Sequence, residues 1–281
     1  MKFGLFGINM GPLGDTDAML AVAEHAEAAG LESVWTGEHV VLPDPQVPPS
    51  PAKPGTPFLD PSVALAAIAA RTERIRLGTG IIILPQRNPV ELAKELASLD
   101  QVSRGRLLFG LGAGYLEPEF RALGANFPER GAVTDEAIDV LRALWTEEKP
   151  AFHGKHYRFE GIDAHPRPHQ SPHPPIIVGG MSRAAARRAA RRGNGWYGFF
   201  TDPDITARSL GWIREAVDEG LRDAKLGDLE VSVSPPPDPD DATFARYAEL
   251  GVHRIVGVST ARTPDDMRRY VDTLAAQAER F

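Results

Sequence analysis

The chain has 281 residues, with 31 Lys and Arg against 38 Asp and Glu, which gives a formal net charge of −7. Hydrophobic residues make up 42% of the sequence and charged residues 25%, as in ordinary globular proteins with a sizeable core. The acidic balance argues against a nucleic-acid partner and against a polybasic membrane surface. The chain has no cysteine, which excludes disulfides, thiol nucleophiles and Cys-ligated metals.

No apolar run approaches the roughly 18 residues of a membrane span. The first ten residues carry one Lys and are interrupted by Gly4 and Gly7, so they indicate a strand rather than a signal peptide. We therefore expect no membrane partner and a cytoplasmic location, with which the lack of cysteine is compatible.

Strand-like and helix-like segments alternate along the chain. Strands are predicted at residues 3–8, 33–36, 76–83, 107–111, 176–178, 196–200, 229–233 and 254–258. Helix starts follow from the capping residues Asp15 or Thr16, Asp60, Asn88, Ser182, Asp202 and Thr263, with further helices around 136–145 and 243–250. Proline concentrates in two loops, 43–61 and 166–175, and a hairpin is predicted at 152–159.

Eight strands alternating with eight helices imply parallel pairing, and eight such units close a barrel. We predict one α/β domain over residues 1–281, a (β/α)8 TIM barrel. It has an insertion and a hairpin after the fourth strand and a Pro-rich loop after the second. A doubly wound open sheet is the alternative, but no Gly-x-Gly-x-x-Gly follows the first strand.

In such a barrel the active site lies at the carboxyl ends of the strands. Three of these ends are rich in glycine: Thr79-Gly80-Ile81, Gly112-Ala113-Gly114-Tyr115 and Gly179-Gly180-Met181-Ser182. A single glycine at a strand end usually supplies only a turn. Several on one rim indicate a flat, bulky ligand that approaches the backbone closely.

The stretch ending at Ser182 precedes a helix whose first turns carry Arg183, Arg187 and Arg188. Free backbone N–H groups at a helix start attract anions, so this end is a candidate phosphate site. The alternative is a plain helix cap beside a solvated, Arg-rich face.

Glu38-His39, at the end of the second strand, is the best acid–base candidate, because histidine titrates near neutral pH. The alternative is a histidine with a structural role. No His-x-His follows the first strand and no Gly-x-Ser-x-Gly is present, so a metal-dependent or triad hydrolase is poorly supported, and we expect no metal.

Six stretches together resemble the luciferase-like monooxygenase superfamily, in the right order and across essentially the whole chain. They are residues 31–41 (LESVWTGEHVV), 72–84 (TERIRLGTGIIIL), 87–91 (RNPVE), 99–116 (LDQVSRGRLLFGLGAGYL), 129–135 (ERGAVTD) and 174–182 (PPIIVGGMS). The chain is most similar to the actinobacterial branch of oxidoreductases that use the deazaflavin coenzyme F-420.

The resemblance implies a barrel, usually a homodimer, that binds a flavin or deazaflavin across the strand ends. The family's catalytic histidine corresponds to His39, and its bulged segment, often with a non-prolyl cis peptide behind the ring, corresponds to Gly80-Ile81. The phosphate loop corresponds to Gly179-Gly180, and residues 112–114 would line the ring's edge.

The chain departs from the family pattern at two positions. Glu38 stands where the family more often has Asp, and Tyr115 stands where some F-420 enzymes have a glutamate acid. Either Tyr115 donates the proton, or the substrate brings its own.

We therefore predict an oxidoreductase that transfers a hydride between coenzyme F-420 and a small organic substrate. His39, Glu38 and Tyr115 are the catalytic candidates, Arg183 helps to hold the phosphate, and the Pro-rich loop forms a lid. Two alternatives keep the fold: an FMN-dependent monooxygenase that uses molecular oxygen, and a flavin-binding barrel without turnover.

Overall fold

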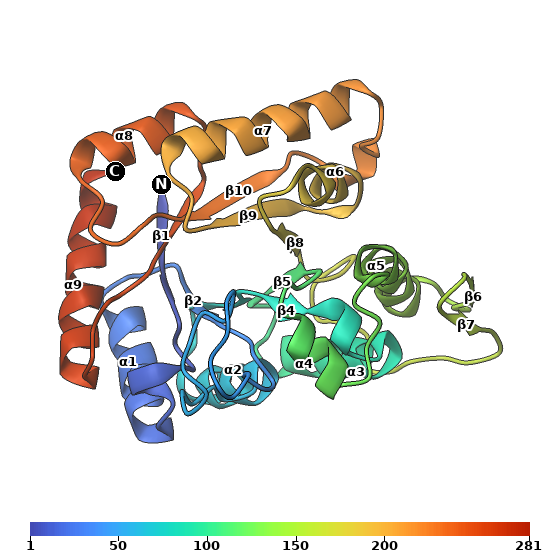
Figure 1. Cartoon of the computed structure of the whole chain (residues 1–281), viewed down its shortest axis with the longest axis horizontal. Coiled ribbons are helices and arrows are strands. Elements are labelled where there is room, and N and C mark those ends of the chain that lie inside the picture. The colour runs from blue at the N-terminus through green and yellow to red at the C-terminus, as the bar shows by residue number, and fades with distance from the viewer.

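A closed ring of eight parallel strands forms the centre of the computed structural model, which describes residues 1–281 (Figure 1). The strands are β1 (Lys2–Phe6), β2 (Ser33–Thr36), β3 (Arg76–Thr79), β5 (Leu107–Gly112), β8 (Ile176–Gly179), β9 (Gly195–Phe199), β10 (Glu230–Ser234) and β11 (Arg254–Gly257). The sheet runs from β3 through β2, β1, β11, β10, β9 and β8 to β5, and pairing of β3 with β5 closes it. The predicted barrel is confirmed and the open sheet is excluded.

Eight long helices surround the ring, one after each strand. They are α1 (Thr16–Ala28), α2 (Pro61–Arg71), α3 (Pro89–Val102), α5 (Arg130–Thr146), α6 (Arg183–Arg192), α7 (Pro203–Asp218), α8 (Asp241–Glu249) and α9 (Pro264–Arg280). Their starts follow the capping signals: the Asp60 carboxylate accepts the N–H groups of Ser62 and Val63, with Pro61 in the first turn. The two chain ends meet, since the Met1 ammonium donates to the Phe281 carbonyl at 2.6 Å (Figure 1). None of the helices has the length and apolar content that crossing a membrane needs.

Two segments differ from the sequence prediction. The third strand was expected to run over 76–83, but β3 ends at Thr79 and the chain resumes as β4 (Ile82–Ile83), paired with the far end of β5. The break is the cis peptide Gly80–Ile81, which the family resemblance implied. The insertion after β5 contains an unpredicted helix, α4 (Glu117–Ala122), while the predicted hairpin is present as β6 (Phe152–His153) and β7 (Arg158–Phe159).

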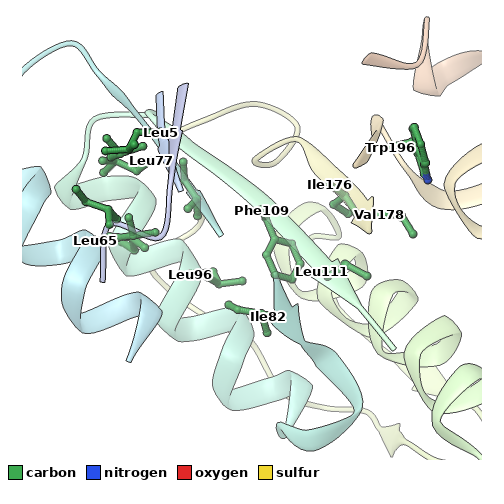
Figure 2. Close-up of a cluster of buried hydrophobic side chains, with 14 of the residues drawn as sticks. Leu5, Leu65, Leu77, Ile82, Leu96, Phe109, Leu111, Ile176, Val178 and Trp196 are labelled. Carbon is green, nitrogen blue, oxygen red and sulfur yellow. The ribbon is translucent and has the colours of Figure 1, made fainter. Parts of the chain in front are cut away.

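Most of the apolar core lies between the ring and the helices. Figure 2 shows Leu65 of α2 beside Leu5 of β1 and Leu77 of β3, and Leu96 of α3 near Phe109 of β5. Alternate residues of these strands point outward to the helices and leave the others for the barrel interior.

The barrel interior is filled at its middle and at its amino end. Trp35 and Tyr197 stack there with ring centroids 5.3 Å apart. Gly78 makes room for Trp35, because a Cβ at that position would lie 2.3 Å from the indole ring. At the amino end, the fully buried Arg254 donates from Nε to Glu32 Oε2 at 2.7 Å. Open space is therefore left at the carboxyl ends of the strands.

Candidate active site

A cavity of about 490 Å³ opens at the carboxyl ends of the strands. It is lined from all three glycine-rich strand ends, from the end of β2 at His39, and from Pro51 in the Pro-rich loop. Gly80 and Gly180 therefore face the same rim, as the sequence predicted. The volume lies within the range of about 300–1,000 Å³ typical of small-molecule sites.

One wall of the cavity is bare backbone packed around Ile81. A Cβ on Gly112 would lie 2.0 Å from Ile81 Cδ1, and one on Gly179 would lie 2.9 Å from Ile81 Cγ2. These two glycines are therefore needed for Ile81 to fit beside the cis peptide, and together they form a glycine platform packed against the Ile81 side chain. Thr79 is buried below this wall, where its hydroxyl donates to the Gly110 carbonyl at 2.6 Å, and it does not line the cavity.

His39 lies between a buried carboxylate and a tyrosine hydroxyl. Its Nδ1 is 3.2 Å from Glu119 Oε2, and its Nε2 is 3.4 Å from the Tyr115 hydroxyl. The Glu119 side chain is fully buried, and its Oε1 accepts the N–H of Val40 at 2.6 Å. A carboxylate can only accept, so Nδ1 carries the proton and the Nε2 lone pair faces Tyr115 and the cavity.

The surroundings shift the pKa values of both partners of His39. Burial alone would raise the pKa of Glu119, but its hydrogen bonds with His39 and the Val40 N–H, together with its attraction to a protonated His39, outweigh burial and lower that pKa. Burial, and then the nearby charge of Glu119, raise the pKa of Tyr115. Tyr115 is thus a neutral hydroxyl at physiological pH, able to donate to Nε2.

Glu119 was not among the site residues predicted from the sequence. Tyr115 stands directly after the fourth strand, but Glu119 lies one turn further on, in α4, and reaches His39 from there. The signal available was the pair Glu117 and Glu119 at the start of a short helix. Only the fold shows that Glu119 is buried while Glu117 is exposed.

Glu38 borders the cavity as His39 does, but its carboxylate is bound by other residues of the chain. Its carboxylate accepts from Arg87 Nε at 3.0 Å and from the Ile83 N–H. Burial alone would lower the pKa of Arg87, but Glu38 and Asp60 outweigh it and raise that pKa. Both carboxylate oxygens of Glu38 are thus engaged in clamping the end of β2 to the segment after β3, an arrangement suited to support rather than to proton transfer.

The start of α6 forms the opposite side of the cavity. Ser182 caps the helix, its hydroxyl accepting the Ala185 N–H at 3.2 Å. Arg183, the predicted phosphate ligand, does not line the cavity: its side chain is 61% exposed and pairs with Glu215 of α7. The cationic side chain on this wall is Arg188, which Asp135 holds through Nε at 2.7 Å.

The end of the Pro-rich loop is fastened to the end of β1. Asn9 is fully buried; its side-chain amide donates to the carbonyls of Gly37 and Leu59, and its oxygen accepts the Gly37 N–H. Met10 and Phe58 form an antiparallel bridge next to this contact. The loop is therefore held over the His39 side of the cavity.

Comparisons with known proteins agree with this geometry. The family model described as luciferase-like monooxygenase matches residues 1–281. The chain belongs to the luciferase-like monooxygenase family. No group of three or more metal-ligating side chains comes together in the structure.

Several relatives lie at 30% sequence identity or above. This luciferase-like chain is 32% identical to an uncharacterized protein of Mycobacterium tuberculosis over 266 residues, covering 92% of each chain. It is 37% identical over 156 residues to the FMNH2-dependent dimethylsulfone monooxygenase of Pseudomonas putida, covering 54% of this chain and 41% of that one.

Two solved structures show the same fold. The luciferase-like chain matches the monooxygenase RslO1 of Streptomyces bottropensis with a TM-score of 0.69 and 29% identity, over 99% of this chain and 80% of that one. It matches an F420-dependent secondary alcohol dehydrogenase with a TM-score of 0.78 and 18% identity, over 98% of this chain and 97% of that one. The neighbours thus include F420-dependent and flavin-dependent enzymes.

Proposed function

We propose that this protein is an oxidoreductase that transfers a hydride between coenzyme F-420 and a small organic substrate, with His39 as the acid–base group. The observation that carries the proposal is one cavity in which the glycine platform lies with an imidazole whose Nε2 is within reach of the Tyr115 hydroxyl. The platform suits a planar ring, and the imidazole suits a substrate oxygen that gains or loses a proton.

The residues present fit such a cofactor. Gly80, Gly112 and Gly179 add no side chains of their own to this wall, so a ring can approach the backbone beside Ile81. Ser182 and Arg188 provide a helix start and a cation for an anionic tail on the other side. When bound, the deazaflavin supplies hydride transfer to or from a substrate carbon.

The protein's own residues handle the proton. With Nδ1 held by Glu119, His39 accepts a proton at Nε2 from a substrate hydroxyl or returns it to a substrate carbonyl, according to the direction of the reaction. Glu119 stabilises the charged imidazole without contacting the substrate, so it is a positioning residue. Pro51 and Phe58 exclude water from this side.

F-420 is the first candidate because the sequence is most similar to the F-420 branch of the family, and an F420-dependent alcohol dehydrogenase has the same fold. An FMN-dependent monooxygenase that uses molecular oxygen is the second candidate, favoured by the 37% identity to the dimethylsulfone monooxygenase.

A side-by-side titration of the purified protein with F-420 and FMN tests the proposal. We expect F-420 to bind more tightly and Arg188→Met to weaken its binding by about 10- to 100-fold, as the loss of a hydrogen bond to a charged group does. Arg183→Met is the matched control and should bind F-420 as the wild type does, because Arg183 pairs with Glu215 outside the cavity.

The other results of this titration are equally informative. Tighter binding of FMN, with oxygen consumption by the reduced form, would replace the proposal by the monooxygenase. Binding of a cofactor without oxidation or reduction of any donor, and without a difference between wild type and His39→Ala, would favour a barrel without turnover. Binding of neither cofactor would overturn the proposal.

A further inference from the structure

The His39 side of the cavity differs in character from the Arg188 side. Phe6, Met10 and Phe58 converge there on Gly37: a Cβ at Gly37 would lie 3.0 Å from Met10 Sδ and 3.5 Å from a ring carbon of each phenylalanine. We refer to Phe6, Met10 and Phe58 as the apolar pocket. The Phe58 and His39 rings meet edge to face with their centroids 5.6 Å apart, so the pocket adjoins the proposed acid–base group directly.

The apolar pocket and the anion-binding wall stand on opposite sides of the barrel mouth. The pocket arises from the ends of β1 and β2, whereas Ser182 and Arg188 follow β8. In the closed ring β1 and β8 are separated by three strands in either direction. A ligand that pairs with Arg188 and does not span the mouth therefore leaves the apolar pocket for a second molecule.

Each side chain near this pocket that can carry a charge is already paired within the protein. His39 lies against the Glu119 carboxylate, Glu38 is bound by Arg87, and Arg188 lies across the mouth with Asp135. A carboxylate, phosphate or sulfonate placed against Met10 and Phe58 would lose its hydration without gaining an unpaired partner, which disfavours its binding. An apolar group is stabilised there in proportion to the apolar surface that it buries.

The pocket is also held in shape by the backbone. Asn9 bonds to Gly37 and Leu59, and the Gly11 N–H donates to the Pro57 carbonyl at 3.1 Å. A preformed pocket selects by the chemistry of its walls, because it does not pay for ordering when it binds.

We propose that the apolar pocket selects an uncharged substrate with an apolar body and one oxygen function, placed so that this oxygen meets His39 Nε2 and the Tyr115 hydroxyl. That the substrate, rather than the cofactor, occupies this side of the cavity rests on the proposed function. Phosphorylated sugars, carboxylates and sulfonates are not substrates under this proposal.

A pair of probes with nearly the same shape and different charge tests this selection. Cyclohexanecarboxamide and cyclohexanecarboxylate are titrated by calorimetry into the protein saturated with whichever of F-420 or FMN it binds, and into the protein alone. We expect the amide to bind at least tenfold more tightly than the carboxylate. Equal affinities, tighter binding of the carboxylate, or no binding of the amide at millimolar concentration would overturn the proposal.

Two Met→Arg variants on opposite sides of the mouth locate the selection. Met10→Arg should abolish or reverse the preference for the amide, whereas Met181→Arg, on the anion-binding side, should retain it. Phe58→Arg serves as a second variant if Met10→Arg does not fold, as judged by circular dichroism. Reversal by Met181→Arg alone would place the substrate elsewhere and overturn the proposal.

The cofactor titration keeps the two hypotheses apart. If neither cofactor binds but the protein alone prefers the amide and loses this preference in Met10→Arg, the pocket stands and the proposed function fails. If a cofactor binds and the probes show no preference, only the pocket fails.

Discussion

Glu119→Gln is the sharpest perturbation of the candidate site. The amide has nearly the shape of the carboxylate, and its oxygen can still accept the Val40 N–H. Its NH2 group, in contrast, would face His39 Nδ1 as a donor. The imidazole must then accept at Nδ1 and carry its proton on Nε2, the tautomer that cannot take a proton from a substrate.

The structure sets the size of the expected effect. At an effective dielectric constant of about 20, opposite charges about 3.2 Å apart attract each other by about 5 kcal/mol. Glu119 offers this attraction only when His39 becomes charged, which happens during proton transfer. We expect turnover to fall by about 10²–10⁴-fold, or roughly 3–5 kcal/mol in the barrier, with little change in cofactor affinity.

Two measurements check this expectation. Steady-state turnover gives the loss of rate, and ¹⁵N-edited NMR of the imidazole shows which ring nitrogen carries the proton. Glu136→Gln is a matched control, because the Glu136 carboxylate also accepts backbone N–H groups, at Lys155 and His156, but lies far from His39 in the fold. A Glu119→Gln enzyme with the wild-type tautomer and at least a tenth of the activity would refute the reasoning.

The same variant has a signature in the pH dependence of stability. The pKa of Glu119 is lowered in the folded protein, so its contribution is complete above its unfolded value of about 4.3 and is lost as the pH falls through the lowered value. Glu119→Gln lacks this titration. The difference in unfolding free energy between wild type and variant should therefore shrink as the pH falls below about 4, which urea denaturation at several pH values measures.

Three further changes probe the anion site, the barrel interior and the hydroxyl beside His39. Ser182→Asp should weaken cofactor binding tenfold or more through charge repulsion, whereas Ser182→Asn, an equally good helix cap, should not; equal affinities in a fluorescence titration would move the anion site elsewhere. Gly78→Ala should lower the free energy of unfolding in urea by about 1–3 kcal/mol, because its Cβ meets Trp35. Gly211→Ala, with open space beside α7, should raise the same free energy by up to about 1 kcal/mol. Similar values for both variants would contradict the packing argument. Tyr115→Phe should lower turnover about two- to tenfold, the worth of one neutral hydrogen bond, and a hundredfold loss would make Tyr115 the acid–base group itself.

The sequence by itself determined the barrel and the rim on which the site lies. Alternating strand and helix signals and capping residues such as Asp60 act locally, so they can be recognised without knowing the fold. The shared rim of Gly80 and Gly180 follows from parallel strands, whose carboxyl ends all point the same way. The family resemblance added the cis peptide at Gly80–Ile81.

The arginine on the cavity wall depended on how α6 is rotated against the barrel. Arg183 and Arg187 are four residues apart and share the face that pairs with α7, whereas Arg188 borders the buried alanines that pack on the ring. The spacing of the alanines indicates the buried face of α6, and therefore which arginine lies next to it. The composition of the first turn alone favoured the wrong side.

Only the tertiary structure decided which carboxylates matter and where the apolar pocket lies. Glu119 is 80 residues from His39 in the chain, and Glu38 is adjacent to it, yet Glu119 reaches the imidazole while Glu38 turns to Arg87. Phe58 meets Met10 in the same way, although the two are 48 residues apart in the chain. Such contacts depend on how distant loops are folded over one rim, and neither local propensity nor periodicity carries that information.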